Sequence, residues 1–302
     1  MSLVVLNPGL QSSVQDLGRA GYRHHGVPVS GAFDTLAHQL GNHLLGNPPG
    51  CASIEMTLIG GAFYFNQPVR ACLCGARASD AVVDDGSIAV PAPHQQVFSV
   101  NARSVLRVGA LREGARSYLC VSGGIETQLL LGSRSALVSI PDAGLGCALK
   151  KGDEIPIGTS THVREIPVQV VSTPIHRNVI RIVPSHHTDS FAVDQIDHIG
   201  RTAYRVGSKS NRAGIRLDGG SLCGSIPARM ESVATLPGYV QVPPDGNPIV
   251  LGVDGPTTGG YPVIACVIER DASRLAQVSP NDRVEFEWIT HEQARAMYEG
   301  ES

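Results

Sequence analysis

Residues 69–90 read VRACLCGARASDAVVDDGSIAV, in which short apolar runs alternate with polar and turn residues. Val69–Cys74 and Ala81–Val83 have the composition of strands, and Asp84-Asp85-Gly86 predicts a hairpin turn after the second run. Similar runs recur on both sides, at Ala62–Phe65, Ser87–Val90, Val97–Val100, Ser104–Val108 and Ser117–Val121. Short strands repeated at this spacing are typical of a β-barrel or β-sandwich. The sequence therefore predicts a mainly β fold.

The second half of the chain repeats this pattern of strands after a polar stretch at residues 158–178, which we interpret as a linker. We predict strands at Val179–Val183, Tyr204–Val206, Tyr239–Val242, Ile249–Val253, Val263–Ile268 and Arg283–Trp288. A length of 302 residues is sufficient for two domains. We place them at residues 1–165 and 175–302.

A few short helices interrupt the strands. Apolar residues at helical spacing predict a helix over residues 36–45, with Asp34 as its N-cap. A second helix is expected near Phe191–Ile196, capped by Thr188 or Asp189, and a third at Arg270–Val278. Thr290-His291-Glu292-Gln293 is a capping-box pattern that starts the last helix.

Composition limits the kind of protein. Hydrophobic residues make up 42% of the chain, enough for a core, and the net charge of −3 without a basic run argues against binding of nucleic acid. We expect no membrane span and no signal peptide, because no apolar stretch is long enough and the first residues lack a charged start. Seven scattered cysteines predict reduced packing residues in a cytoplasmic protein.

Three polar, glycine-rich stretches are the candidates for a functional site. The first, residues 15–34, reads QDLGRAGYRHHGVPVSGAFD. Its composition alone favours a solvated loop over a ligand-binding one. The second, Ser208–Leu217, holds two arginines suited to an anion, although a solvated hairpin explains them equally well. The third, Gln241–Pro262, carries two Asp-Gly turns and then two adjacent glycines before a strand.

Several known sites are missing from the sequence. It contains no phosphate-binding P-loop, no nucleophile elbow and no zinc-binding HExxH motif. His186-His187 with nearby Asp189 is a weak metal motif, because adjacent histidines rarely face one ion. We predict no metal site.

Taken together, the three stretches resemble the allophanate hydrolase subunit 2 or biotin-dependent carboxyltransferase family, which includes the 5-oxoprolinase C subunits and the antagonist of the kinase inhibitor KipI. The matching motifs span residues 5–288 and include Gln15-Asp16-Leu17-Gly18-Arg19, Leu131-Gly132-Ser133-Arg134, Ser210-Asn211-Arg212, Gln241-Val242-Pro243, Asp254 and Thr258-Gly259-Gly260-Tyr261-Pro262. The resemblance implies two tandem cyclophilin-like β-barrel domains.

The resemblance also implies partners and alternative activities. It implies a companion subunit similar to KipI or allophanate hydrolase subunit 1, and a small amide as substrate. One branch opens 5-oxoproline to glutamate with ATP and a lactam-utilisation subunit. Another moves a carboxyl group from carboxybiotin, on a separate carrier protein, to urea or a related amide. A third possibility is a binding module that sequesters a kinase inhibitor without catalysis.

The residues that match the family's motifs are the expected site. The catalytic candidates are Asp16, Arg19, Asn211, Arg212, Asp254 and Tyr261. The candidates for binding substrate or nucleotide are Tyr22, His24, Ser30, Arg216, Gln241, Asp245, Thr258, Gly259 and Gly260. Arginines would hold the anion and stabilise charge in the transition state, and aspartates would orient an amide N–H or act as the base.

Overall fold

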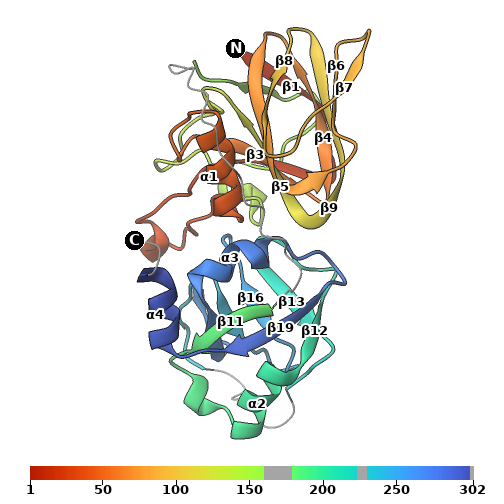
Figure 1. The fold of residues 1–302 in the computed structure, drawn as a ribbon. Coiled ribbons are helices and arrows are strands. Elements are labelled where there is room, and N and C mark those ends of the chain that lie inside the picture. The colour runs from red at the N-terminus through yellow and green to blue at the C-terminus, as the bar shows by residue number, and fades with distance from the viewer. Residues whose placement is uncertain (160–178, 223–229, 300–302) are drawn as a thin grey trace. The chain divides into compact units, whose positions relative to one another are not determined.

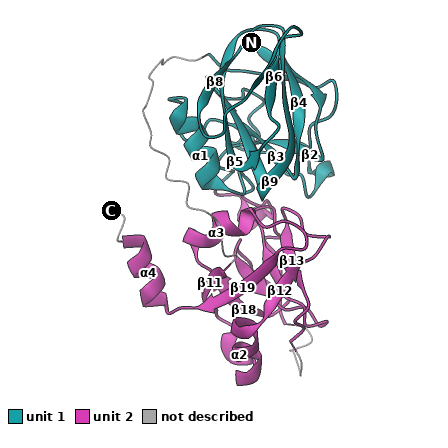
Figure 2. Cartoon of the chain, turned by 45° about the vertical axis from the view of Figure 1, so that its right-hand side comes forward, with its two compact units in different colours: residues 1–19, 30–174 teal, residues 20–29, 175–302 magenta. Residues whose placement is uncertain are grey.

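The computed structural model describes residues 1–159, 179–222 and 230–299 (Figure 1). The chain forms two compact units, coloured separately in Figure 2. Unit 1 comprises Met1–Arg19 and Ser30–Pro174, and unit 2 comprises Ala20–Val29 and Ile175–Ser302. The stretch at residues 15–34 is therefore divided between them. Most of the expected linker at residues 158–178 lies outside the described residues.

Unit 1 is built around a ten-stranded sheet with the path β10-β1-β4-β9-β3-β2. Its strands are β1 (Ser2–Asn7), β2 (Gln11–Gln15), β3 (Ser53–Thr57), β4 (Ile59–Phe65), β5 (Val69–Ala78), β6 (Val82–Asp84), β7 (Ala89–Pro91), β8 (Val97–Val100), β9 (Ser104–Val121) and β10 (Glu154–Pro156). The hairpin expected at Asp84-Asp85-Gly86 joins β6 to β7, which confirms that prediction.

Strand β9 corrects the expectation of two separate strands at Ser104–Val108 and Ser117–Val121. These segments form one strand of 18 residues, whose first part pairs with β4 and β6 and whose last part pairs with β3. Between the two segments, Glu113 and Gly114 adopt positive φ angles of 57° and 151° within the strand. Pairing with β5 holds at Arg112 and again at Ser117, so these residues form an irregularity within one strand.

Helix α1 (Thr35–Leu44) confirms the helix predicted near residues 36–45. The Asp34 carboxylate accepts a hydrogen bond from the Ala37 N–H at 3.0 Å, as an N-cap should. The helix packs on β5 and β9, over the buried thiols of Cys72, Cys74 and Cys120. Gly41 provides the space for this contact, since a Cβ there would lie 2.5 Å from Cys120 Sγ.

Replacing Gly41 by alanine is expected to lower the free energy of unfolding by about 1–2 kcal/mol, although alanine is the better helix former. The added methyl group has no room beside Cys120. The double variant Gly41→Ala/Cys120→Ala should recover much of this loss, and a double-mutant cycle in urea measures the coupling. Strictly additive effects of the two substitutions would contradict the close packing.

A buried network of hydrogen bonds fixes Phe33 and Asp34, the residues that precede α1. Glu55 Oε2 accepts hydrogen bonds from the Tyr118 hydroxyl at 2.7 Å and from the Phe33 N–H at 2.9 Å. The Tyr118 hydroxyl in turn accepts one from the Asp34 N–H at 2.8 Å. Burial and the nearby carboxylates raise the pKa of Tyr118 well above its ordinary value. The tyrosine therefore stays protonated and can donate to Glu55.

Unit 2 is a closed barrel with the strand order β11-β18-β15-β16-β13-β12-β19. Its strands are β11 (Val179–Pro184), β12 (Ala203–Val206), β13 (Gly214–Asp218), β15 (Tyr239–Gln241), β16 (Ile249–Leu251), β18 (Val263–Val267) and β19 (Arg283–Trp288), and a separate two-stranded ribbon joins β14 (Val233–Ala234) to β17 (Thr258–Gly259). All barrel pairs are antiparallel except β11 with β19. The mainly β prediction is confirmed, and this unit provides the closed barrel.

Three helices accompany the barrel: α2 (Val193–Arg201), α3 (Glu269–Ala276) and α4 (His291–Glu299). Thr290 and Gln293 form the expected capping box at α4. The expected cap of α2 is wrong, because Thr188 and Asp189 form a separate 3-10 turn and the N-cap is Ala192, whose N–H donates to Gln195 Oε1.

None of the described helices has the length and apolar character needed to cross a membrane.

Candidate functional site

Asp16 organises a loop of unit 1. Its Oδ1 accepts hydrogen bonds from the hydroxyls of Ser133 at 2.6 Å and Ser135 at 2.5 Å and from the Gly18 N–H at 2.7 Å, and its Oδ2 accepts one from the Arg134 N–H at 2.7 Å. Burial alone would raise the pKa of Asp16, but these donors outweigh it and lower the pKa. A carboxylate stabilised in this way is a weak base, so the geometry favours a positioning role over catalysis.

Arg19 and Ser30 are also engaged within unit 1. Arg19 is 1% exposed, and its guanidinium donates to the carbonyl oxygens of Ser135 and Leu130. The Ser30 hydroxyl donates to the Ala136 carbonyl oxygen at 3.3 Å. Both side chains fix the same loop that Asp16 holds. Of the predicted site residues, these three form an architectural group.

Between Arg19 and Ser30, residues 20–29 belong to unit 2. The short 3-10 helix η1 (Arg23–His25) lies at the centre of this loop and ends at Gly26, whose φ is 80°. The Arg23 guanidinium donates to the Thr235 carbonyl oxygen. Tyr22 and His24 are thereby presented by a loop that is anchored to the second unit.

Thr235 connects several of the predicted residues of unit 2. It is fully buried, its hydroxyl donates to the Pro256 carbonyl oxygen at 2.5 Å, and its N–H donates to the Thr257 carbonyl oxygen at 3.0 Å. It directly follows β14, which pairs with β17 at Thr258 and Gly259. Neither Arg23 nor Thr235 was predicted. Thr235 is an isolated threonine without a recognisable motif, and only the polar composition of the loop pointed to Arg23.

Gln241 has a buried amide nitrogen without a hydrogen-bond partner. The residue is 4% exposed, and Nε2 finds no acceptor in the described part of the chain. Gly259 lies against it, since a Cβ on this glycine would be 2.7 Å from Nε2 and 3.1 Å from Thr235 Cγ2. Because a buried donor without an acceptor is costly, such a group marks a place where a ligand or water would bind.

Arg212 and Asp254 form a buried, bidentate ion pair. Arg212 Nε donates to Asp254 Oδ2 and Arg212 Nη2 to Oδ1, both at 2.9 Å. The side chains are 3% and 0% exposed. A further hydrogen bond from the Asp254 N–H to the Arg212 carbonyl oxygen joins their backbones. The structure thus brings together two predicted catalytic residues. Each would have to act on a substrate while bound to the other.

The remaining predicted residues of unit 2 are more accessible. Asn211 caps a turn by accepting from the Ala213 N–H at 2.8 Å, and Asp245 accepts from the Asn247 N–H at 3.2 Å. Arg216 is exposed on β13, and Thr258 is exposed on β17. Tyr261 is 44% exposed, next to Gly260, whose carbonyl oxygen accepts from the Met230 N–H. Thr258, Gly260 and Tyr261 are neighbours in the chain of Gly259, the glycine that lies against the Gln241 amide.

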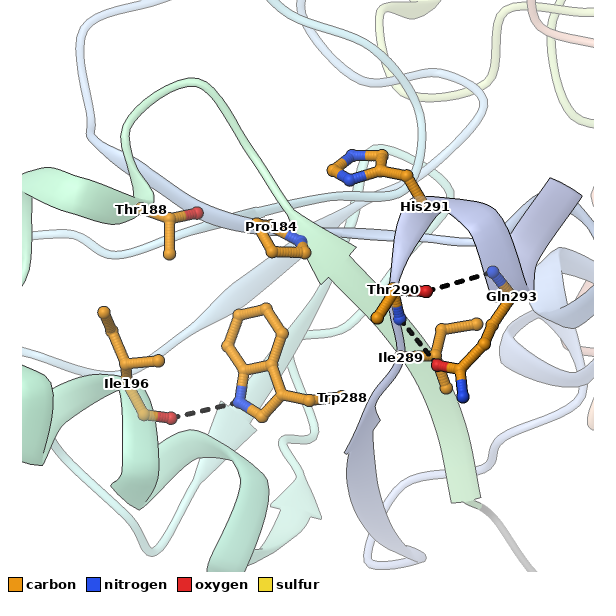
Figure 3. Close-up of a pocket in the computed structure, with 8 residues that line it drawn as sticks. All are labelled: Pro184, Thr188, Ile196, Trp288, Ile289, Thr290, His291 and Gln293. Atoms are coloured by element: carbon orange, nitrogen blue, oxygen red, sulfur yellow. Dashed lines mark hydrogen bonds between the residues drawn. The ribbon is translucent and has the colours of Figure 1, made fainter.

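A mostly apolar pocket of about 420 Å³ opens between β11, α2 and the start of α4 (Figure 3). Its lining residues are Pro184, Thr188, Ile196, Trp288, Ile289, Thr290, His291 and Gln293. The Trp288 indole N–H is satisfied by the Ile196 carbonyl oxygen at 3.1 Å, as the dashed line shows. None of the predicted site residues lines this pocket.

The adjacent histidines His186 and His187 follow β11. The rings of His186 and His187 are 3.9 Å apart, and His187 Nδ1 accepts from the Val263 N–H. Burial and the neighbouring His186 lower the pKa of His187. Within residues 1–159, 179–222 and 230–299, no group of three or more His, Cys, Asp or Glu side chains could hold an ion.

Comparisons with known proteins agree with this architecture. The chain is 35% identical to the 5-oxoprolinase C subunit of Escherichia coli and 34% identical to that of Haemophilus influenzae, over 97% of this chain and 93% of each relative. It is 28% identical to urea amidolyase of Saccharomyces cerevisiae, but it corresponds to only 17% of that protein.

Solved structures also match this chain over nearly its full length. The crystal structure of Kluyveromyces lactis urea carboxylase matches 99% of this chain with a TM-score of 0.86 and 26% identity, over 28% of its own chain. Residues 25–288 match the family described as carboxyltransferase domain, subdomain A and B. The resemblance seen in the sequence motifs is therefore confirmed. This chain belongs to the carboxyltransferase-domain family that includes the 5-oxoprolinase C subunits.

Proposed function

We propose that this chain is part of a complex that opens the ring of 5-oxoproline to give glutamate with hydrolysis of ATP, and that it acts with a KipI-like companion and a lactam-utilisation subunit. The observation that carries the proposal is the similarity to two 5-oxoprolinase C subunits over 97% of this chain and 93% of theirs. The relatives from the urea branch share lower identity and are several times longer.

The donors of unit 2 suit this chemistry. Opening the ring breaks the C–N bond of the lactam and adds water, and negative charge develops on the carbonyl oxygen as this occurs. The Gln241 amide and the Tyr261 hydroxyl are donors that could face a small amide. The buried Arg212–Asp254 pair would hold the turn at residues 252–257 in place. In this assignment Arg212 and Asp254 are positioning residues.

The N-termini of the described α-helices do not fit a triphosphate. The described α-helices have an acidic cap or an acidic first turn: Asp34 at α1, Asp194 at α2, Glu269 and Asp271 at α3, and Glu292 at α4. A carboxylate at a helix N-terminus repels phosphate. We therefore assign no step through ATP to these residues and propose that the nucleotide binds elsewhere in the complex.

Carboxyl transfer is the second candidate, and the match to the urea carboxylase structure favours it. In that case carboxybiotin would arrive on a separate carrier, and the acceptor would be urea or a related amide. A binding module without catalysis is the third. The buried, unpartnered donor of Gln241 favours a small ligand over a purely protein-binding role.

The test is an ATPase assay of the reconstituted complex. We expect ATP hydrolysis to require all of the proteins in the complex. It should be stimulated by 5-oxoproline and not by urea, and glutamate should form in equal amount to ADP. Each protein alone is the control. Transfer of carboxylate from carboxybiotin to urea, without turnover of 5-oxoproline, would instead establish the second candidate. Assembly without either reaction would favour the binding module.

A further inference from the structure

His38 is a fully buried histidine on α1, with a hydrogen-bonding neighbour at each ring nitrogen. Its Nδ1 is 2.8 Å from the Ser53 hydroxyl oxygen, and its Nε2 is 3.3 Å from the Asn42 amide nitrogen. A ring nitrogen of histidine can either donate or accept, and the proton itself is assigned from the groups around it. The protonation state of His38 therefore follows from the direction of these two bonds.

Two asparagines fix that direction, starting from the backbone. The Asn47 amide nitrogen donates to the Val121 carbonyl oxygen at 2.8 Å, and its Oδ1 accepts from the Gly123 N–H at 3.0 Å. Because a backbone carbonyl only accepts and an N–H only donates, the Asn47 amide has one possible orientation. Its nitrogen also donates to Asn42 Oδ1 at 3.0 Å, which turns the Asn42 nitrogen to the Cys51 carbonyl oxygen, 2.8 Å away.

The remaining N–H of Asn42 has His38 Nε2 as its acceptor. Nε2 then carries no proton, and the neutral ring holds its proton on Nδ1, which donates to the Ser53 hydroxyl. His38 Nδ1 is therefore not a base for that hydroxyl. A proton added to Nε2 would face the Asn42 N–H or turn to the carbonyl oxygen of Pro49, a nearby backbone acceptor. In both cases Asn42 loses its acceptor.

The surroundings of the ring favour its neutral form. Burial lowers the pKa of His38, and the carboxylates of Asp16 and Glu55 offset this only in part. The Tyr118 ring meets the imidazole edge-on, with 6.0 Å between the ring centres. On α1 the other titratable side chain is the exposed His43. The remaining titratable groups around this part of the helix are Asp34, Cys51, Cys72, Cys74, Arg116 and Cys120.

We propose that His38 is an acid-sensitive lock on α1. While its ring is neutral, it joins the helix to β3 and, through Asn42, to the loop at residues 46–51 and the end of β9. Protonation breaks the bond to Asn42 and loosens the helix, together with the Phe33–Asp34 segment that leads into it. The end of the first polar stretch, residues 15–34, is thereby made sensitive to acid.

The lock gives α1 a defined dependence on pH. The open helix exposes His38 with an ordinary pKa of 6.5, whereas the closed helix holds the pKa lower, so opening takes up a proton as the pH falls below this value. Hydrogen exchange of the full chain, corrected for the intrinsic rate at each pH, measures this. Protection of the α1 amides should be constant above about pH 7 and should fall by up to about tenfold per pH unit below about pH 6.

His38→Gln is the test variant, because a neutral amide has no proton to take up. It should abolish the pH dependence at α1, whatever its effect on stability. His43→Gln, on the same helix, is the matched control and should retain the dependence. His94→Gln is the second control, since burial also lowers the pKa of this histidine of unit 1. Asn42→Asp supplies a carboxylate that accepts from the protonated ring, so it should remove the loss of protection above about pH 5.

Nitrogen NMR of the imidazole in the wild-type chain follows the ring directly, and at neutral pH we expect the proton of His38 on Nδ1. A neutral ring with its proton on Nε2 would overturn the lock. So would a pH dependence at α1 that persists in His38→Gln, or protection of α1 that stays constant while the ring titrates. If His38→Gln does not fold, Asn42→Asp and the wild-type NMR titration carry the test.

Discussion

Replacing Asp254 by alanine is expected to lower the free energy of unfolding of unit 2 by about 3–5 kcal/mol. The substitution leaves the guanidinium of Arg212, whose side chain is 3% exposed, without the carboxylate that now receives two of its N–H groups. Most of the loss therefore comes from an uncompensated buried charge. Urea unfolding followed by fluorescence measures it, since Trp288 is the only tryptophan and lies in this unit.

The double variant Arg212→Met/Asp254→Leu provides the decisive comparison. If the loss arises from the remaining charge, removing both charges restores most of the stability, because the ion pair itself adds little over apolar packing. Asp245→Ala, at an exposed turn, is the control and should change the stability by no more than about 0.5 kcal/mol. An Asp254→Ala protein as stable as wild type, but inactive in the complex, would make Asp254 a catalytic residue.

Replacing Asp16 by alanine should destabilise unit 1 by about 4 kcal/mol, because several donors, including two hydroxyls, lose their acceptor in a buried loop. The loop at residues 130–136 should become the first part of the unit to open. Hydrogen exchange at the N–H groups of Gly18 and Arg134 reports this directly. Asp16→Asn keeps one acceptor oxygen and should lose less. Protection at both amides as in wild type would contradict the assignment.

The same carboxylate gives unit 1 a defined dependence on pH. The pKa of Asp16 is lower in the folded than in the unfolded chain, where it is about 3.9. Its contribution to stability is therefore fully present above about pH 5 and is lost as the pH falls through the folded-state pKa. The difference in stability between wild type and Asp16→Ala should shrink in this acidic range, which unfolding curves at successive pH values measure.

Much of the fold could be predicted because local signals and tertiary packing agree. Helix α1 has apolar residues at helical spacing and an aspartate cap, and the structure uses both. The β6–β7 turn has the composition that a hairpin needs. By contrast, β9 runs without a break through Glu113 and Gly114, which lie between the two runs that we predicted as separate strands. Its continuity depends on pairing with strands distant in sequence, which a local pattern cannot reveal.

The candidate site was predicted less completely. Polar residues among glycines identified the segments of interest, but this pattern does not separate side chains that support a loop from those that face a ligand. Asp16 and Arg19 support a loop, and Arg212 and Asp254 bind one another. The unpartnered amide of Gln241 could be recognised only from its surroundings. The sequence did not identify Thr235, because only its hydrogen bonds in the folded chain distinguish it from other threonines.

The parallel pairing of β11 with β19 has a consequence for how the protein folds. It joins the first barrel strand of unit 2 to the last, through Val179 opposite Glu285 and Ile182 opposite Trp288. Barrel closure thus brings together residues about a hundred positions apart, and contacts of such sequence separation form slowly. During synthesis the edge of β11 stays unpaired on this side until residues 283–288 have left the ribosome. The second unit is therefore exposed to aggregation for longer than a barrel closed by neighbouring strands would be.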